Sequence, residues 1–163
     1  MARYGMDIMV REGMVAFEDF VAPHLQMMWL LATRMAGPQD REDIVQEALT
    51  TAWRKFDTYD ASRGSARTWL LVLVADRSRK HWRSARPTLE LVDRPAAVPD
   101  FEAHLDVTRA VRKLPRRQRM AVELFYVLGL PVAECALVMG CTTGTISSAL
   151  SDARAALRIS LEA

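Results

Sequence analysis

Basic side chains gather in two short stretches of this sequence, and both are suited to binding a nucleic acid. Arg63, Arg67 and Trp69 lie just before the first stretch. That stretch, DRSRKHWRSAR, contains His81, Trp82 and five bases, which are Arg77, Arg79, Lys80, Arg83 and Arg86. Basic side chains interleaved with an aromatic ring are typical of protein surfaces that hold a phosphate backbone and stack unpaired nucleobases. A structural role for Trp82 in the core is the alternative.

The second basic stretch, RKLPRRQRM, surrounds the start of a predicted helix. Its five bases are Arg112, Lys113, Arg116, Arg117 and Arg119. Arginines at a helix N-terminus are well placed to bind phosphate oxygens. A solvated helix end is the alternative. Together, the two basic stretches predict a two-part contact with an extended anion.

Acidic side chains mark a different candidate surface. Asp43 and Glu47 lie one helical turn apart, with Gln46 beside them, on the side opposite Trp53 and Phe56. Acids in a first helical turn often only complement the helix dipole, and this remains an alternative for Asp43. Glu47 lies deeper in the helix, so the three residues form a candidate surface for a basic partner.

Helices must position these residues, because the composition favours an all-α protein. Leu, Ala, Met, Arg and Glu recur, whereas Gly and Pro are scarce. Apolar spacing predicts one helix from about Val15 to Met35 and a second after the break at Gly37–Asp40. A third is predicted from about Ala66 to Ala85. The polar loop before it, Asp57–Ser65, ends on a residue type that caps helices.

A proline-containing segment divides the helical pattern in two. Residues 86–101 include Pro87, Pro95 and Pro99 and lack helical periodicity, as expected of a linker. The sequence therefore predicts two small helical domains, residues 1–85 and residues 102–163.

The end of the second domain has the pattern of a helix-turn-helix. Ala133, Ala136 and Leu137 form the predicted apolar face of a short helix, and Gly140 permits a left-handed turn after it. The apolar face of the following helix is predicted to comprise Ile146, Leu150, Ala153, Leu157 and Leu161. Periodicity alone does not separate a packed helical hairpin from a DNA-reading helix.

The other face of the last helix offers hydroxyl groups rather than bases. Its hydroxyl residues are Thr142, Thr143, Thr145, Ser147, Ser148 and Ser151. Hydroxyls can bond phosphates or base edges, and Ala149 is small enough to approach a thymine methyl group. Arg154 is the only base between Thr142 and Leu157, so weak DNA binding is expected.

Other function classes find little support. The net charge of +2 is only mildly basic, and the longest apolar run, Trp69–Ala75, is too short to span a bilayer. The N-terminus lacks the pattern of a signal peptide, so we expect a cytoplasmic protein without membrane insertion. Neither a phosphate-cradling Gly-rich loop nor the spacing of a catalytic triad is present. We therefore expect no enzyme and no small-molecule substrate.

Metal ions and cofactors are not expected either. His24, His81 and His104 lie in three different segments without ligand spacing. Cys135 and Cys141 flank the predicted turn, where a redox or metal switch is one interpretation. Two thiols without a nearby histidine make a poor site, so small buried hydrophobes are the better interpretation.

Four ordered motifs resemble the extracytoplasmic-function (ECF) sigma factors of the sigma-70 family. In chain order they are E-D-I-V-Q-E, R-G-S-x-R-T-W-L, L-P-x-x-Q-R and G-x-x-x-G-T-I-x-S. The stretch from Asp40 to Arg83 resembles region 2 of that family, and the stretch from Leu114 to Leu157 resembles region 4. The resemblance implies a subunit that binds core RNA polymerase, directs promoter-specific initiation and is controlled by an anti-sigma factor.

The resemblance also implies roles for individual residues. Docking on the core polymerase would involve Asp43, Gln46 and Glu47. Capture and melting of the −10 promoter element would involve Tyr59, Arg63, Ser65, Arg67, Trp69, Asp76, Arg77, Lys80 and Arg83. Binding of the duplex −35 element would involve Arg116, Arg117, Arg119, Thr142, Thr143, Thr145, Ser147, Ser148, Ser151 and Arg154.

Two departures from the family pattern affect DNA recognition. Asp76 lies where members often have Asn, and an ionised Asp only accepts hydrogen bonds and repels phosphate. Positions that are commonly basic in region 4 are here Ser147, Ala149, Ser151 and Asp152. A reduced reliance on the −35 element, or help from a second protein, would follow.

Two other functions remain open at this point. One is a two-domain helix-turn-helix transcriptional regulator that does not dock on core polymerase. The other is a sigma-like protein that acts mainly through protein partners. Co-purification with core polymerase separates the first from a sigma factor, and DNA affinity at low salt tests the second.

Overall fold

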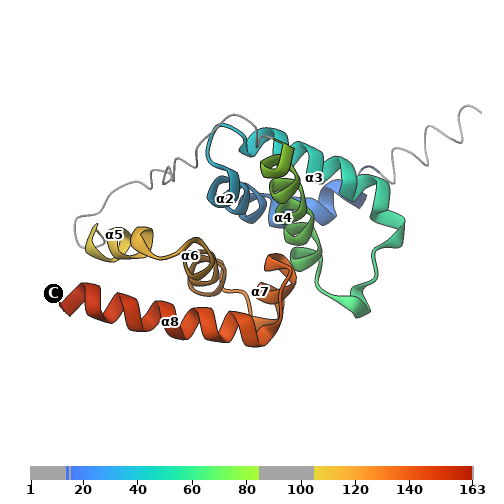
Figure 1. Cartoon of the computed structure of the whole chain (residues 1–163). Helices are drawn as coiled ribbons and strands as arrows, with labels where there is room; N and C mark the ends of the chain where they lie inside the picture. The colour runs from blue at the N-terminus through green and yellow to red at the C-terminus, as the bar shows by residue number, and fades with distance from the viewer. Residues whose placement is uncertain (1–13, 15, 85–104, 163) are drawn as a thin grey trace, which may run out of the picture. The chain divides into compact units, whose positions relative to one another are not determined.

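The computed structural model describes residues 14, 16–84 and 105–162, and these residues contain helices and turns but no strand. The chain divides into two compact units, whose described residues are 14–84 (without 15) and 105–162 (Figure 1). The predicted all-α, two-domain organisation is therefore confirmed. The predicted linker, residues 86–101, lies outside the described residues, so its bounds stay a prediction.

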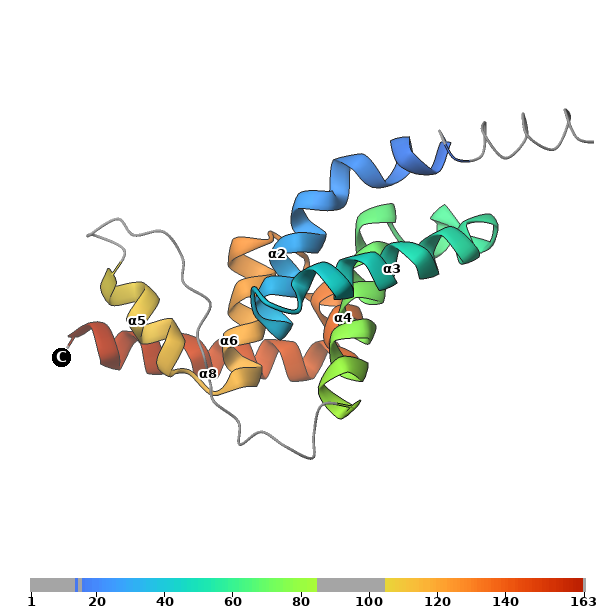
Figure 2. The ribbon, with the colours of Figure 1, turned by 90° about the horizontal axis from the view of Figure 1, so that it is seen from above.

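Three long helices of the first unit form its core, and they are α2 (Leu25–Ala36), α3 (Arg41–Lys55) and α4 (Ala66–Ser84). All three pack against one another, as Figure 2 shows from above. Their fully buried side chains form the core of the unit, and the larger ones are Met28, Leu31, Ile44, Val45, Leu70, Leu71 and Val74.

The predicted uninterrupted helix from Val15 to Met35 is wrong. Residues 16–21 are helical, but a 3-10 turn, Ala22–His24, separates them from α2. Pro23 lies inside this turn, and proline has no backbone N–H to donate to an α-helical hydrogen bond. Val15 lies outside the described residues.

The connection between α3 and α4 is fixed by short-range hydrogen bonds across two 3-10 turns, Phe56–Thr58 and Ala61–Arg63. The Asp60 carboxylate accepts the Ser62 backbone N–H at 2.9 Å. The Ser65 hydroxyl accepts the Thr68 backbone N–H at 3.2 Å, which confirms Ser65 as the cap of α4.

An aromatic cluster joins residues 16–21 to this connection and to α4. The Phe20 ring meets Tyr59 and Phe56 edge-on, with ring centroids 4.9 Å and 5.1 Å away. Trp53, predicted on the buried side of its helix, is 42% exposed and meets only the edge of Phe17 among the ring contacts found in the described residues. Its indole contributes less to the core than its spacing suggested.

The second unit contains α5 (Leu105–Lys113), α6 (Arg116–Val122), α7 (Val132–Met139) and α8 (Thr143–Glu162). The first three of these pack along α8, the long red helix in Figures 1 and 2. A π-helical turn, Glu123–Val127, extends α6. The core of the second unit includes the almost fully buried side chains of Leu124, Leu130, Cys135, Val138, Ile146 and Ala153.

Part of the apolar pattern predicted for the helix-turn-helix is wrong. Ala133 is exposed, Leu137 is 56% exposed and Leu161 is 49% exposed. Ala136 is buried as predicted, and the other buried residues of α7 are Cys135 and Val138. A short helix contacts its neighbours along a narrow stripe, so a shift of one residue changes which side chains that stripe buries.

The turn itself agrees with the sequence. Gly140 has φ 64° and ψ 41°, the left-handed conformation that glycine adopts without strain. The Cys141 N–H donates to the Ala136 carbonyl at 3.0 Å, which closes the end of α7. The Thr142 hydroxyl then accepts the Thr145 N–H at 3.2 Å and caps α8.

Candidate nucleic-acid and partner interfaces

The three predicted docking residues lie together on the solvent-facing side of α3. Asp43, Gln46 and Glu47 are all exposed, opposite the buried face that contains Ile44 and Ala48. They line one shallow depression with other side chains of α3, Thr50, Thr51 and Arg54, and with two of α4, Arg77 and His81.

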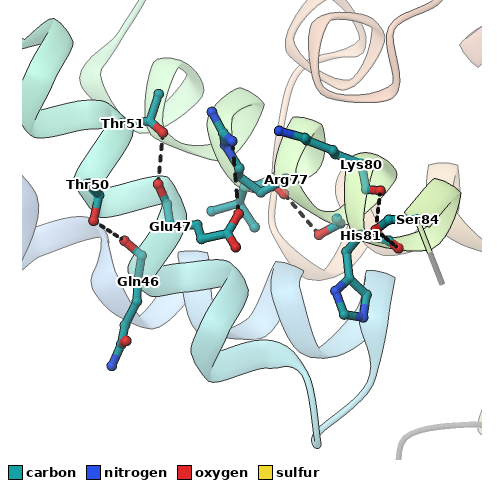
Figure 3. A network of polar contacts seen from close by, with 10 residues as sticks. Gln46, Glu47, Thr50, Thr51, Arg77, Lys80, His81 and Ser84 are labelled. Carbon is teal, nitrogen blue, oxygen red and sulfur yellow. Dashed lines mark hydrogen bonds and ion pairs between the residues drawn. The ribbon is translucent and has the colours of Figure 1, made fainter.

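Two contacts between nitrogen-bearing and carboxylate side chains cross from α4 to the neighbourhood of α3. Arg77 Nη1 lies 3.9 Å from Glu47 Oε2, and His81 Nε2 lies 3.4 Å from Asp40 Oδ2. Figure 3 shows Glu47 directed towards Arg77, whereas Gln46 points away from it. The surface is therefore a polar one of mixed charge, rather than the acidic patch that α3 alone suggests.

Thr50 and Thr51 line the depression but bond their hydroxyls to the backbone of α3. Thr50 and Thr51 donate their hydroxyls to the backbone carbonyls of Gln46 and Glu47, at 2.9 Å and 2.8 Å (Figure 3). Because these bonds use backbone acceptors, they do not engage the Glu47 carboxylate.

Several residues predicted to touch the −10 element also hold the fold together. The Tyr59 hydroxyl donates to the Gly64 carbonyl at 3.1 Å, and its ring lies 5.3 Å from that of Trp69. Both rings are half-buried beside Phe20, and Ser65 caps α4. A base stacking on this cluster would therefore meet partly exposed, pre-ordered rings.

The bases of α4 divide between two faces of the helix. Lys80 and Arg83 are exposed and share a face with Asp76, by i, i+4, i+7 spacing. Arg77 and His81 share a different face, the one that meets α3. Arg79 pairs with Asp76, so the unusual acid has a cation beside it. Arg86 lies outside the described residues.

Trp82 has a structural role. Its indole N–H donates to the Met35 carbonyl at 2.8 Å, near the end of α2, and the side chain is half-buried. The alternative left open by the sequence, a core position, is the one that the contact supports.

Arg63 and Arg67 differ in their surroundings. Arg63 is exposed in the connection between α3 and α4. Arg67 is half-buried in the first turn of α4, and its positive charge acts on His24. Burial, and then this charge, lower the pKa of His24 from its ordinary value.

The basic stretch from Arg112 to Arg119 is also divided. Arg116 and Arg117 are exposed at the beginning of α6. Arg119 is half-buried and donates to the Arg112 carbonyl at 3.0 Å, where it closes the end of α5. Lys113 is the exposed last residue of α5.

The exposed face of α8 carries hydroxyls, as predicted. Thr143, Ser147 and Ser151 are exposed and share a face with Arg154, and Ser148 is exposed beside them. Thr142 and Thr145 bond each other through their hydroxyls at 3.0 Å. Arg154, the only base between Thr142 and Leu157, donates to the Tyr126 hydroxyl at 3.4 Å.

Ala149 does not lie on that exposed face. It is buried, so the predicted approach to a thymine methyl group is wrong. The side chain packs in the interior instead, since it falls between the buried residues Ile146, Leu150 and Ala153.

The cysteines have the character of packed hydrophobes rather than ligands. Cys135 is fully buried and its thiol donates to the Leu130 carbonyl at 3.4 Å. Burial raises the pKa of this thiol to about 11, so it is protonated at neutral pH. Cys141 is half-buried, and both thiols are free. His104 lies outside the described residues, and the described ones include no cluster of three metal-ligating side chains.

Sequence reasoning did not assign five residues of this depression to a docking surface, and these are Thr50, Thr51, Arg54, Arg77 and His81. Thr50 and Arg54 follow Asp43 and Glu47 at helical spacing, which is a signal that could have found them. Arg77 and His81 come from another helix and had no such signal. Within the described residues, no helix has the length and apolar content needed to cross a membrane.

Comparison with known proteins identifies the family of both units. Residues 20–88 match the family model for sigma-70 region 2, and residues 104–157 match the model for sigma-70 region 4. The ECF RNA polymerase sigma factor SigC of Mycobacterium tuberculosis is 36% identical over 152 residues, which cover 87% of this chain and 81% of that protein. SigF of Caulobacter vibrioides is 36% identical over 131 residues, covering 76% and 73%.

Solved structures agree on the fold. The sigma factor RpoE, solved in complex with the anti-sigma factor NepR from Bartonella quintana, superposes with a TM-score of 0.68 at 23% identity, covering 90% of this chain and 97% of that one. CnrH, in complex with the cytosolic domain of CnrY, gives 0.65 at 24% identity, covering 91% and 89%. With region 2, region 4 and these relatives in agreement, the chain belongs to the ECF sigma factors of the sigma-70 family.

Proposed function

We propose that this chain docks on core RNA polymerase through α3 and directs transcription initiation at a specific class of promoters. The observation that carries the proposal is the exposed polar face of α3, where Asp43, Gln46 and Glu47 line one depression. Exposed carboxylates one turn apart suit a partner that presents basic side chains.

The first unit is proposed to capture the −10 element as single-stranded DNA. Arg63, Lys80 and Arg83 are exposed and can hold the phosphate backbone, whereas the rings of Tyr59 and Trp69 are pre-ordered for stacking. Pre-ordered rings lower the entropy cost of capturing a flipped base. Ser65 and Arg67 complete the proposed contact at the start of α4. Because Asp76 replaces the Asn that is common in the family, we expect an unusual nucleobase preference at the −10 element.

The second unit is proposed to bind the −35 element as duplex DNA, with α8 in the major groove. Arg116 and Arg117 supply positive charge for the phosphates, and the hydroxyls of Thr143, Ser147 and Ser151 face outward to meet base edges or phosphates. Few bases on α8 mean little counterion release, so binding of an isolated −35 duplex is expected to be weak.

An anti-sigma factor is the proposed regulator. RpoE was solved with such a partner, and CnrH with the cytosolic domain of CnrY. We propose that the chain itself catalyses no reaction, because the polymerase carries out RNA synthesis. It supplies binding free energy to the open complex, and we place it in the cytoplasm, where transcription occurs in bacteria.

Run-off transcription with purified core polymerase on a genomic promoter library tests the proposal. Discrete start sites that appear only when the chain is added to core support it. Transcription that needs another sigma factor in the mixture would instead identify a helix-turn-helix regulator. The same reactions return the promoter sequence, because the selected −10 and −35 elements can be read from the start sites.

A further inference from the structure

Arg77 lies on the side of α4 that meets α3. It lines the same depression as Asp43, Gln46 and Glu47, and its guanidinium reaches to 3.9 Å from the Glu47 carboxylate (Figure 3). Lys80 and Arg83 do not line this depression. On a helix, positions 77 and 83 lie about 120° apart, whereas positions 77 and 80 lie about 60° apart, so Lys80 is a neighbour of Arg77 that stays outside the depression.

The charge of the depression is balanced. Asp43 and Glu47 contribute two carboxylates, whereas Arg54 and Arg77 contribute two guanidinium groups. A partner with only basic side chains would meet repulsion from both arginines, since like charges brought together across an interface oppose binding. A partner of mixed charge fits the whole surface.

The ion pair of Arg77 leaves its guanidinium available to a partner. The Glu47 side chain is 64% exposed and the Arg77 side chain is 29% exposed, and their 3.9 Å separation is at the outer limit for an ion pair. Pairs of this kind are weak in water. Arginine has five donors in a rigid fork, so Arg77 can hold Glu47 and also donate to a partner's carboxylate or carbonyl.

We infer that the polymerase-docking surface extends from α3 onto α4, with Arg77 as a direct contact of the core polymerase. This inference rests on the proposed function. The polymerase surface would present bases to Asp43 and Glu47 and an acidic or carbonyl acceptor to Arg77. Arg77 is then reassigned from the −10 element, where the family resemblance had placed it, to the polymerase.

Three charge reversals in the full chain separate these roles. Arg77→Glu tests the docking surface, Lys80→Glu tests the proposed DNA face of the same helix, and Lys55→Glu is the control. Lys55 is an exposed base of α3 that does not line the depression. Affinity for core polymerase is measured by fluorescence titration, and promoter opening is measured afterwards with core saturated by each variant.

Arg77→Glu is expected to weaken core binding about tenfold or more, with promoter opening recovered at saturation. Lys80→Glu should keep the wild-type affinity for core and lose promoter opening, and Lys55→Glu should keep both. Wild-type core affinity together with lost promoter opening in Arg77→Glu would overturn the inference and return Arg77 to the −10 element.

Two further measurements keep the test decisive. Arg77→Gln removes the charge without adding a repulsive one, and a smaller loss of core affinity, about threefold, is expected while thermal unfolding stays unchanged. Unchanged core affinity in Arg77→Gln and Arg77→Glu overturns the inference.

If the wild-type chain itself does not bind core, the proposed function fails. If wild type binds and Asp43→Arg with Glu47→Arg abolishes binding, but both Arg77 variants bind normally, only the extension onto α4 fails.

Discussion

The indole N–H of Trp82 donates to the backbone carbonyl of Met35 at 2.8 Å, across 47 positions of sequence. This bond ties the last turn of α4 to the end of α2 and satisfies one of the carbonyls that a helix C-terminus leaves without an intrahelical partner. Trp82 therefore stabilises the first unit, although it lies in a basic stretch of the type that binds nucleic acids.

Trp82→Phe is expected to destabilise the first unit by about 1–3 kcal/mol, because the Met35 carbonyl loses its donor in a partly buried place. Urea unfolding followed by circular dichroism measures the loss. Trp53→Phe is the matched control, since Trp53 is 42% exposed and its ring contact with Phe17 survives in part. Equal unfolding midpoints for the two variants would contradict the structural role of Trp82.

Asp43→Arg combined with Glu47→Arg is expected to abolish binding to core polymerase and to leave the fold intact, because both side chains are exposed. A pull-down with tagged core measures binding, and circular dichroism checks the helices. Glu42→Arg serves as the control, since Glu42 is an exposed acid of the same first turn that lies outside the depression. Wild-type binding by the double variant would rule out docking through this face.

The stability of the first unit is expected to fall as pH falls below 6.5. Burial and the charge of Arg67 lower the pKa of His24 from 6.5 in the folded chain, so the unfolded chain binds the proton first. The resulting loss grows from pH 6.5 down to the folded pKa and is absent at higher pH. Unfolding of wild type and His24→Gln at several pH values measures it, and an identical slope between pH 7 and 5 in the variant would exclude His24 as its source.

Cys141 is expected to react with iodoacetamide in the folded protein, whereas Cys135 is not. Burial raises the pKa of Cys135 to about 11, so almost none of it is the reactive thiolate, and the side chain is inaccessible. Peptide mass spectrometry after native and denatured alkylation gives the two extents. Rapid native modification of Cys135 would show that the core of the second unit opens readily.

Ser147→Arg is expected to strengthen binding of a −35 duplex and to steepen its salt dependence by about one phosphate contact, because Ser147 is exposed on the face proposed to meet DNA. Titration of the duplex at several salt concentrations measures both quantities. Ser160→Arg, an exposed serine near the far end of α8, controls for added charge alone. Equal gains in the two variants would argue against α8 as the reading helix.

The sequence predicted features that depend on neighbours within a few residues. The helical stretch from Ala66, its Ser65 cap and the Gly140 turn follow from local spacing and backbone preference, and the structure confirms them. The exposed side of α3 with Asp43 and Glu47 could be predicted for the same reason, because helical periodicity fixes which residues lie opposite a buried face.

Other features depend on which elements pack together, and only the tertiary structure decided them. The exposure of Leu137 depends on the narrow stripe that the short helix α7 buries, and the burial of Ala149 depends on the helices that pack along α8. Arg77 reaches Glu47, and Trp82 reaches Met35, because α4 packs against both α3 and α2. Contacts between residues 30 to 47 positions apart leave no periodic signal along the chain. Only the packing of the helices therefore showed which basic side chains of α4 lie against α3 and which face solvent.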